Sequence, residues 1–310
     1  MPLFKPKKML DHKLLKGVIL VGLGATSYGM LATFVKIAYT EGYSTAEVTT
    51  AQFVYGLIGL LTLNLIFLAK KNNATVAVTQ KETLQLIAAG TSTGLTSLFY
   101  YLAVKYIPVS IGIVLLMQTV WMGVLLEWFL DKKAPSFQKI SAVFIVLLGT
   151  ALAINILKIN FDAQEVDWAA GLFWGLLAAA SFTTTMFTAN RIATSVPVQK
   201  RSILMLLGGA IIVFSFALFT QETSFNMGIF SKWGIVLALF GTIIPPLLLN
   251  AGFPHTGIGL GSIVSSLELP VSVLMAYFIL NEEVIAIQWF GIVLIISAII
   301  IMNLNFKKKS

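Results

Sequence analysis

The chain has 310 residues, of which 57% are hydrophobic and 11% are charged, and its mean hydropathy is +0.89. Ordinary globular proteins contain about 25% charged residues, so this composition excludes a soluble, collagen-like or disordered chain. The sequence also lacks the alternating segments of roughly ten residues that build membrane β-barrels. We therefore expect an all-α integral membrane protein.

Ten apolar segments are long enough to cross a bilayer as helices, because a hydrocarbon core of about 30 Å requires about 20 residues. They are expected at residues 17–38, 46–69, 83–104, 108–129, 137–157, 168–191, 200–219, 232–252, 257–280 and 286–306. A basic segment (1–16) precedes them, a connection (158–167) separates two sets of five, and a basic tail (307–310) follows. The first apolar segment is too long for a signal-peptide core, so we interpret it as a retained helix.

Lysine and arginine are distributed unequally between the two sides that these segments define. With the N-terminus inside, 17 of the 21 Lys and Arg residues fall on the cytoplasmic side and three on the other, while Lys36 lies within the first helix. Because positive residues accumulate in cytoplasmic loops, both termini are predicted to be cytoplasmic, in the inner membrane. The formal net charge of +8 is then a topology signal, and nucleic-acid binding is not expected.

The second half of the sequence resembles the first at an offset of 150 residues. Ile113-Val114 aligns with Ile263-Val264, Leu130 with Leu280, Gln138 with Gln288, and Gln118 lies opposite Glu268. Because each half has an odd number of helices, the second half begins on the opposite side of the membrane. Such inverted repeats occur in transporters whose substrate site lies near the membrane midplane.

The motifs around Glu268 also resemble those of a known family. Leu267-Glu268-Leu269-Pro270-Val271, followed by Tyr277 to Glu282, is similar to the LEPV…LLGE stretch of the EamA family, in the drug/metabolite transporter superfamily. In the first half, Ala103 to Ile107, Gln118 to Leu130 and Phe137-Gln138-Lys139 resemble its ALKYTSA…P…LGE…Q pattern, with Val120 at the proline position and Lys132 at the glutamate position. The resemblance implies a ten-helix carrier of small metabolites, often directed outward.

Glu268 lies near the middle of the ninth predicted segment. An ionisable group at this depth costs roughly 2.5–3.5 kcal/mol on insertion scales, and desolvation favours its neutral form. Two interpretations stay open. Glu268 is either a proton carrier or partner for a cationic substrate, or a structural acid that ties its helix to the neighbouring helices.

Other candidate binding residues are polar or aromatic. Thr93, Ser97 and Tyr100, together with Thr96, share one face of the third helix. Gln118 and Trp121 lie one turn apart on the fourth, where an indole can stack on a planar or cationic substrate, although packing is its commoner role. The resemblance places a lysine at Lys36 in many members, which adds Lys36 as a candidate.

Three prolines predict interruptions of the membrane helices. Pro245 and Pro246 lie at the centre of the eighth segment, and Pro270 follows Glu268 by two residues. Proline has no N–H and frees a carbonyl, which at membrane depth requires a protein or water partner. We expect these segments to line a cavity or to act as gating elements.

These features predict a secondary transporter that moves amino acids or related small metabolites by alternating access, in the outward direction. Its partners would be the substrate and the lipid bilayer, with proton coupling as one alternative and the oligomeric state left open. The alternatives are a passive channel and, more remotely, an intramembrane enzyme with Ser262 as nucleophile and His255 as the candidate base. There is no cysteine, and the two histidines lack metal-ligand spacing, so neither a metal nor another cofactor is expected.

Overall fold

The computed structural model describes residues 12–70, 78–156, 166–221 and 224–303, and no strand occurs among them. The helices are α1 (His12–Thr40), α2 (Thr45–Lys70), α3 (Gln80–Tyr106), α4 (Val109–Leu116), α5 (Thr119–Asp131), α6 (Phe137–Ala153), α7 (Trp168–Arg191), α8 (Val198–Thr220), α9 (Ile235–Ala238), α10 (Ile244–Ser265), α11 (Glu268–Ile279) and α12 (Ala286–Asn303). Two π-helical turns, Phe230–Gly234 and Leu239–Ile243, flank α9. The expected all-α class is confirmed for these residues.

Six stretches of the described chain are long and apolar enough to cross a membrane. They are α1, Thr45–Ala69 of α2, Ile111–Asp131, α7, α8 and Phe230–Ile279, and shorter apolar helices lie at Phe137–Ala153 and Ala286–Met302. The molecule is therefore a multi-pass membrane protein. Its first helix begins at His12, five residues before the predicted start at 17. The predicted tail 307–310 and most of the predicted segments 1–16 and 158–167 lie outside the described residues.

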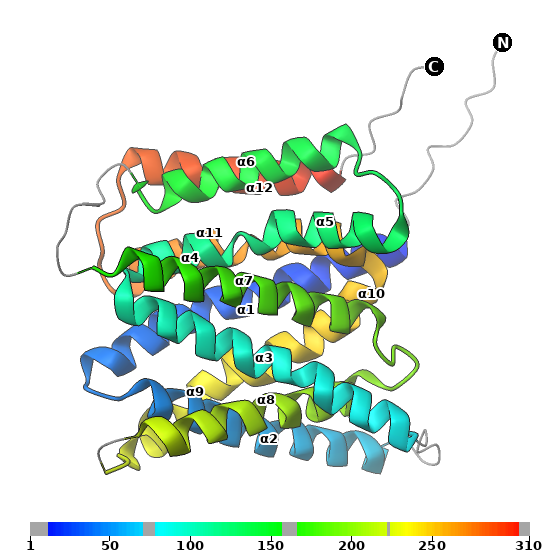
Figure 1. Ribbon diagram of the computed structural model, residues 1–310, viewed down its shortest axis with the longest axis vertical. Coiled ribbons are helices and arrows are strands. Elements are labelled where there is room, and N and C mark those ends of the chain that lie inside the picture. The colour runs from blue at the N-terminus through cyan, green and yellow to red at the C-terminus, as the bar shows by residue number, and fades with distance from the viewer. Residues whose placement is uncertain (1–11, 71–77, 157–165, 222–223, 304–310) are drawn as a thin grey trace.

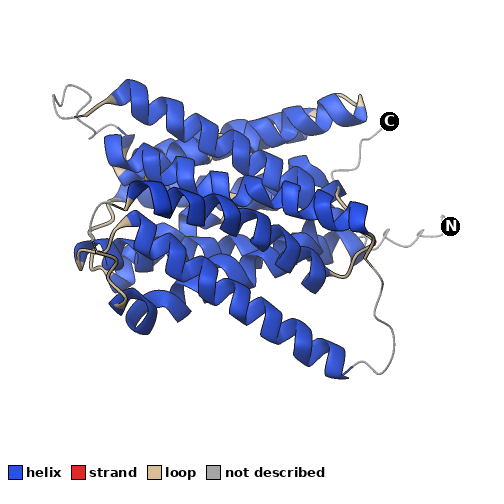
Figure 2. Ribbon diagram, turned by 60° about the horizontal axis from the view of Figure 1, so that its bottom comes forward, coloured by secondary structure: helices blue, strands red, loops and turns tan. Residues whose placement is uncertain are grey.

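The helices lie side by side in layers (Figure 1). α6 packs on α12 at one edge, and α2 packs on α8 at the opposite edge. Between these pairs, α3 packs on both α7 and α8, and α10 packs on α1. A second view shows the same bundle of helices joined by loops at its two ends (Figure 2). α1 begins and α12 ends on the same side, which is also the side where α5 and α7 end (Figure 1).

Two of the predicted membrane segments are divided at corresponding positions. Segment 108–129 is split into α4 and α5 at Met117-Gln118, and segment 257–280 is split between α10 and α11 at Ser266-Leu267. An interruption was expected from Pro270 in segment 257–280, whereas segment 108–129 contains none of the three prolines and was expected to be continuous. Glu268, expected near the middle of its membrane segment, is the first residue of α11.

Local hydrogen bonding explains these breaks. Pro270 has no N–H to give to the carbonyl of Ser266, so the helical ladder stops there. Val120 stands at the corresponding position of the first half, where the amide of Gln118 donates to the carbonyl of Val114 at 3.0 Å. A side chain thus satisfies a backbone carbonyl at the break that has no proline.

The chain between residues 230 and 265 is irregular because of its prolines and one glycine. Pro245 and Pro246 lie in the first turn of α10, directly after the second π-helical turn. Gly257 has a φ of 74° and a ψ of 174°, so α10 contains a sharp change of direction at this residue. Only glycine adopts this conformation without strain. The predicted segments 232–252 and 257–280 lie on either side of this bend.

Candidate functional site

A cavity of about 160 Å³ lies between the two halves of the chain. Its wall is formed by α1, α2, α3, α4, α7, the second π-helical turn and α11. Its polar, charged and aromatic lining residues are Tyr28, Lys36, Tyr39, Gln52, Phe53, Thr93, Thr96, Ser97, Tyr100, Tyr101, Phe182, Thr185, Thr242, Glu268 and Ser272. Five residues proposed from the sequence as substrate-binding, namely Lys36, Thr93, Ser97, Tyr100 and Glu268, are among them.

The polar face of α3 forms one wall of this cavity, because residues three and four apart share a side of a helix. The hydroxyl of Thr96 donates to the carbonyl of Ser92 at 2.8 Å, and that of Ser97 donates to the carbonyl of Thr93 at 3.4 Å. Each hydroxyl hydrogen is thus directed to the backbone. What these side chains offer to a ligand is the lone pairs of their oxygen atoms.

Glu268 reaches the cavity from the first turn of α11. α1 approaches it closely, since a Cβ atom at Gly29 would collide with the carbonyl oxygen of Glu268. Tyr28 and Tyr100 lie near enough to the Glu268 carboxyl group to interact with it electrostatically. Within the described residues, no hydrogen bond or ion pair engages this carboxyl group.

Lys36 stands at the opening of the cavity, near the end of α1. Its ammonium group forms an ion pair with Glu282, which follows α11, and the two side chains are 53% and 44% exposed. The cavity lining extends from Glu268 toward this pair and includes Tyr39. We call this side of the molecule the Lys36 end.

Gln118 and Trp121 do not belong to the cavity lining that the structure describes. The indole N–H of Trp121 donates to the side-chain oxygen of Gln118 at 2.8 Å, and the Gln118 amide is bonded to a backbone carbonyl. The polar groups of Gln118 and Trp121 are therefore hydrogen-bonded to each other and to a backbone carbonyl at the break between α4 and α5. Of the three prolines, Pro246 lines a second cavity of about 20 Å³, while Pro245 and Pro270 are buried in the first turns of their helices.

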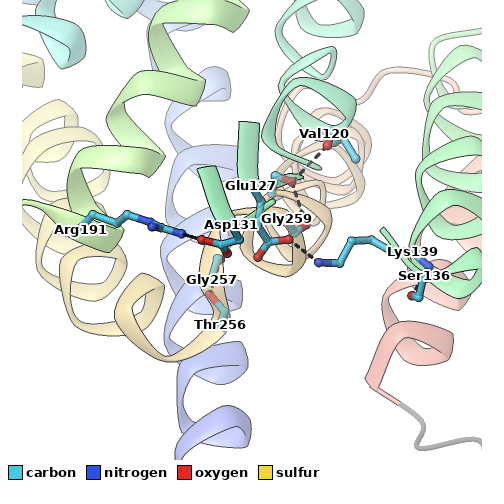
Figure 3. A network of polar contacts seen from close by, with 10 residues as sticks. Val120, Glu127, Asp131, Ser136, Lys139, Arg191, Thr256, Gly257 and Gly259 are labelled. Atoms are coloured by element: carbon cyan, nitrogen blue, oxygen red, sulfur yellow. Dashed lines mark hydrogen bonds and ion pairs between the residues drawn. The ribbon is translucent and has the colours of Figure 1, made fainter. Parts of the chain in front are cut away.

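The opposite side of the molecule carries a network of charged side chains next to glycines of α10 (Figure 3). Arg191 at the end of α7 forms an ion pair with Asp131 at the end of α5. Glu127 of α5 forms an ion pair with Lys139 of α6. A Cβ atom at Gly257 would lie 2.7 Å from the Glu127 carboxylate, so the network sits directly on the bend of α10.

Arg201 lies deep in this closed side and is only 1% exposed. Its guanidinium group donates to the carbonyls of Asn250 at 3.0 Å and of Ala189 at 2.7 Å. Pro254 has no N–H for the Asn250 carbonyl, so Arg201 replaces a missing helical hydrogen bond. We call this side of the molecule the Arg201 end.

Arg201 is one of the 17 Lys and Arg residues assigned from the sequence to the cytoplasmic side, and the structure shows that its side chain is buried. The burial of Arg201 could have been inferred from Pro254, which lies four residues after Asn250. Because proline has no N–H, the carbonyl of Asn250 needs another donor. Tyr39, Tyr101 and Thr242 were also missed as lining residues, because their side chains carry no sequence pattern that separates them from packing residues.

A metal site and the Ser262 nucleophile were the two chemical alternatives, and both can be checked in the part of the chain that the structure describes. No group of three or more His, Cys, Asp and Glu side chains there is placed to hold a metal ion. Ser262, weighed as a nucleophile, is fully buried. Its hydroxyl group donates to the carbonyls of Gly259 at 2.9 Å and Val120 at 3.2 Å, which is the behaviour of a helix-packing serine.

Comparison with protein-family models matches residues 15–155 and 169–304 to the EamA-like transporter family. This match confirms the resemblance inferred from the motifs around Glu268. Curated proteins contain no match to this chain. Among solved structures, one described only as the crystal structure of a protein has a TM-score of 0.76 and 15% sequence identity, over 95% of this chain and 99% of that chain. At this identity, the likeness concerns the fold alone.

Proposed function

Because this chain belongs to the EamA-like transporter family, whose members are membrane transporters of the drug/metabolite transporter superfamily, we propose that it carries a small metabolite through its cavity as a secondary transporter. The proposed substrate is an amino acid or a related compound, and the proposed direction is outward. The observation that carries this proposal is the cavity, which is lined by both family repeats and runs toward the Lys36 end.

The difference between the two ends supports alternating access. A carrier exposes its site to one side of the membrane at a time, while its repeats rock around that site. Here the cavity opens toward Lys36 and Tyr39, whereas Arg201 of α8 bonds to carbonyls of α7 and α10 at the other end. These features support an assignment of the structure to the state of the cycle in which the site is open at the Lys36 end.

Two reciprocal hydrogen bonds support a pair of inverted five-helix repeats. Gln138, near the start of α6, donates to the carbonyl of Ile301, near the end of α12. Gln288, near the start of α12, donates to the carbonyl of Ala153 at the end of α6 at 3.0 Å. The equivalent glutamines of the two halves thus bond across the same helix pair, one from α6 to α12 and the other from α12 to α6. A two-fold axis between the halves would produce this arrangement.

We propose ten membrane crossings with both termini in the cytoplasm of the inner membrane. α4 and α5 together form one crossing, and the bend at Gly257 separates two crossings within Phe230–Ile279. The Arg201 end then faces the cytoplasm and the Lys36 end faces the opposite side, in agreement with the excess of basic residues near the termini. Proton coupling through Glu268 is a further element of this proposal.

Counterflow in proteoliposomes tests the function. Vesicles holding purified protein are preloaded with pooled amino acids, nucleobases and amines, and uptake of each labelled compound is followed with and without a proton gradient. A carrier produces saturable exchange that a preloaded substrate accelerates. Flux that neither saturates nor shows counterflow would favour a passive channel, and the absence of any exchange by correctly folded protein would contradict the proposal.

A cavity-filling variant ties the exchange to this site. Ser97→Phe introduces a ring into the cavity and should reduce exchange by about ten-fold or more, because a filled site cannot admit substrate. Ser215→Phe makes the same change on an exposed position of α8 and serves as the matched control. Equal exchange by the two variants would remove the cavity from the transport path.

A further inference from the structure

The charges around the cavity leave Glu268 without a counter-charge. The charged side chains of the lining are Lys36 and Glu268, and Lys36 is already paired with Glu282. A carboxylate in the first turn of α11 is stabilised by the helix N-terminus, yet it has lost much of its contact with bulk water. A positively charged ligand would compensate for this loss of hydration by pairing with the Glu268 carboxylate, whereas an anionic ligand would be repelled by it.

Three hydroxyl groups of the lining present their oxygen atoms as hydrogen-bond acceptors. Besides Thr96 and Ser97, Thr242 donates its hydrogen to the carbonyl of Gln52 at 2.9 Å. Oxygen atoms whose hydrogens are used in this way accept hydrogen bonds from a ligand. An ammonium group supplies only donors, so it matches these oxygens.

Aromatic rings line the way from the opening to Glu268. The ring centroids of Tyr39 and Tyr101 are 6.1 Å apart, and those of Tyr101 and Tyr100 are 5.9 Å apart. On the other side, Tyr28 contacts Phe182 edge-on, with centroids 6.1 Å apart. The faces of such rings attract cations, and this attraction is stronger where water is excluded.

From these three observations we infer that, among the amino acids and related compounds proposed above, the substrate of this cavity is a small organic cation: an amine whose charge is paired by Glu268 and whose apolar part lies against Tyr28 and Tyr100. The inference rests on the proposed function, since it takes the cavity as the transport site. The cavity volume of about 160 Å³ is below the roughly 300–1,000 Å³ of sites for drug-sized ligands, so the amine is a small one.

Three probes of similar size and different charge test this inference. Equilibrium dialysis of the purified full chain in detergent measures binding of labelled benzylamine, a cation at neutral pH, and of benzyl alcohol and benzoate. Benzylamine is expected to bind, and to bind at least ten-fold more tightly than either of the other two. Binding of the alcohol or the acid that equals or exceeds that of benzylamine would overturn the inference, as would the absence of benzylamine binding.

Variants locate the charge that makes the distinction. Glu268→Gln keeps the shape of the side chain and removes its charge, so benzylamine affinity should fall about 30-fold or more, while Glu268→Asp should retain part of it. Glu283→Gln removes an exposed acid of the loop after α11 and should leave affinity unchanged. Thermal unfolding of each variant shows whether it is folded, and Tyr100→Leu, which should also weaken benzylamine binding, replaces Glu268→Gln if that variant does not fold.

The outcomes separate this inference from the proposed function. Counterflow of neutral or anionic substrates, with no selective binding of benzylamine, would overturn the cation site and leave the transporter standing. Charge-selective binding that depends on Glu268, without counterflow of any amine, would support the cation site and contradict transport. Unchanged benzylamine binding by folded Glu268→Gln would overturn the assignment of Glu268.

Discussion

The two ends of the molecule carry the same kind of ion pair, but only one of them is open to a cavity. Lys36 and Glu282 form the pair at the Lys36 end, and Arg191 and Asp131 form it on the side of Arg201. In each pair, the basic residue lies near the end of the first helix of one half, α1 or α7. The acidic residue lies at or just after the end of the fourth predicted segment of the other half. Since the pairs are equivalent, they do not decide which end is open.

Side-chain size along the same helices makes the difference. Near the Arg201 end, a Cβ atom at Gly17 of α1 would lie 3.1 Å from the carbonyl oxygen of Gly252 of α10, so the two backbones touch. A Cβ atom at Gly90 of α3 would collide with the carbonyl group of Met205 in α8. Toward the Lys36 end, α1 and α3 instead carry large side chains such as Tyr39 and Tyr101, which hold the helices apart around the cavity.

The largest expected effect comes from enlarging a glycine at the closed end. Gly90→Ala forces a methyl group into the backbone of α8 and should lower the free energy of unfolding by about 2–3 kcal/mol. Ser97→Ala, a change of similar size on the same helix but in the cavity, should cost less than about 1 kcal/mol. Thermal or denaturant unfolding in detergent measures both, and equal losses would show that the two ends are packed alike.

A double-mutant cycle tests the role of Arg201 at the closed end. Arg201→Met leaves the carbonyls of Asn250 and Ala189 without their donor, which should cost about 2 kcal/mol of stability. Pro254→Ala restores an N–H that can bond to Asn250, so Arg201→Met should cost about 1 kcal/mol less in that background. Additive losses in the cycle would mean that Arg201 does not compensate for the proline.

Chemical labelling compares the water access of the two ends directly. Because the chain contains no cysteine, single thiols can be introduced without background. Ser97→Cys in the cavity should react with a water-soluble maleimide at least about ten times faster than Ser202→Cys, which replaces a fully buried serine beside Arg201. Faster reaction at position 202 would indicate that the molecule in the membrane is open toward the Arg201 end.

The smallest expected effect concerns an acid in the loop after α1, at the Lys36 end. The indole N–H of Trp233 donates to Glu41 at 2.7 Å, and this bond, followed by the one from Lys232, lowers the pKa of Glu41 below its ordinary value. A lowered pKa means that the contact persists at neutral pH and is lost only as the pH falls through that lowered value.

Tryptophan fluorescence follows this contact in acid. The difference between the native chain and Trp233→Phe should stay constant from pH 7 downward and change with a midpoint below about 4.3, the usual value for glutamate. A midpoint at or above that value would contradict the hydrogen bond between Trp233 and Glu41.

Much of the candidate site was predictable because its signals are local. Helical periodicity placed Thr93, Ser97 and Tyr100 on one face of α3, and the scarcity of acids in apolar segments singled out Glu268. The repeat placed Gln118 opposite Glu268, but no local signal indicated that Gln118 would be absent from the cavity lining. The structure turns Gln118 into a partner of Trp121 and leaves Glu268 facing the cavity.

The sequence by itself determined the membrane class, the helical content and the family, since apolar length, backbone hydrogen bonding and motif spacing are properties of short segments. Tertiary structure alone decided that Arg201 is buried, that Lys36 pairs with Glu282 and that the cavity opens at one end. Each of these depends on how closely two helices approach. That distance is set by glycines and bulky side chains on helices far apart in the chain, which meet only after the whole bundle has formed.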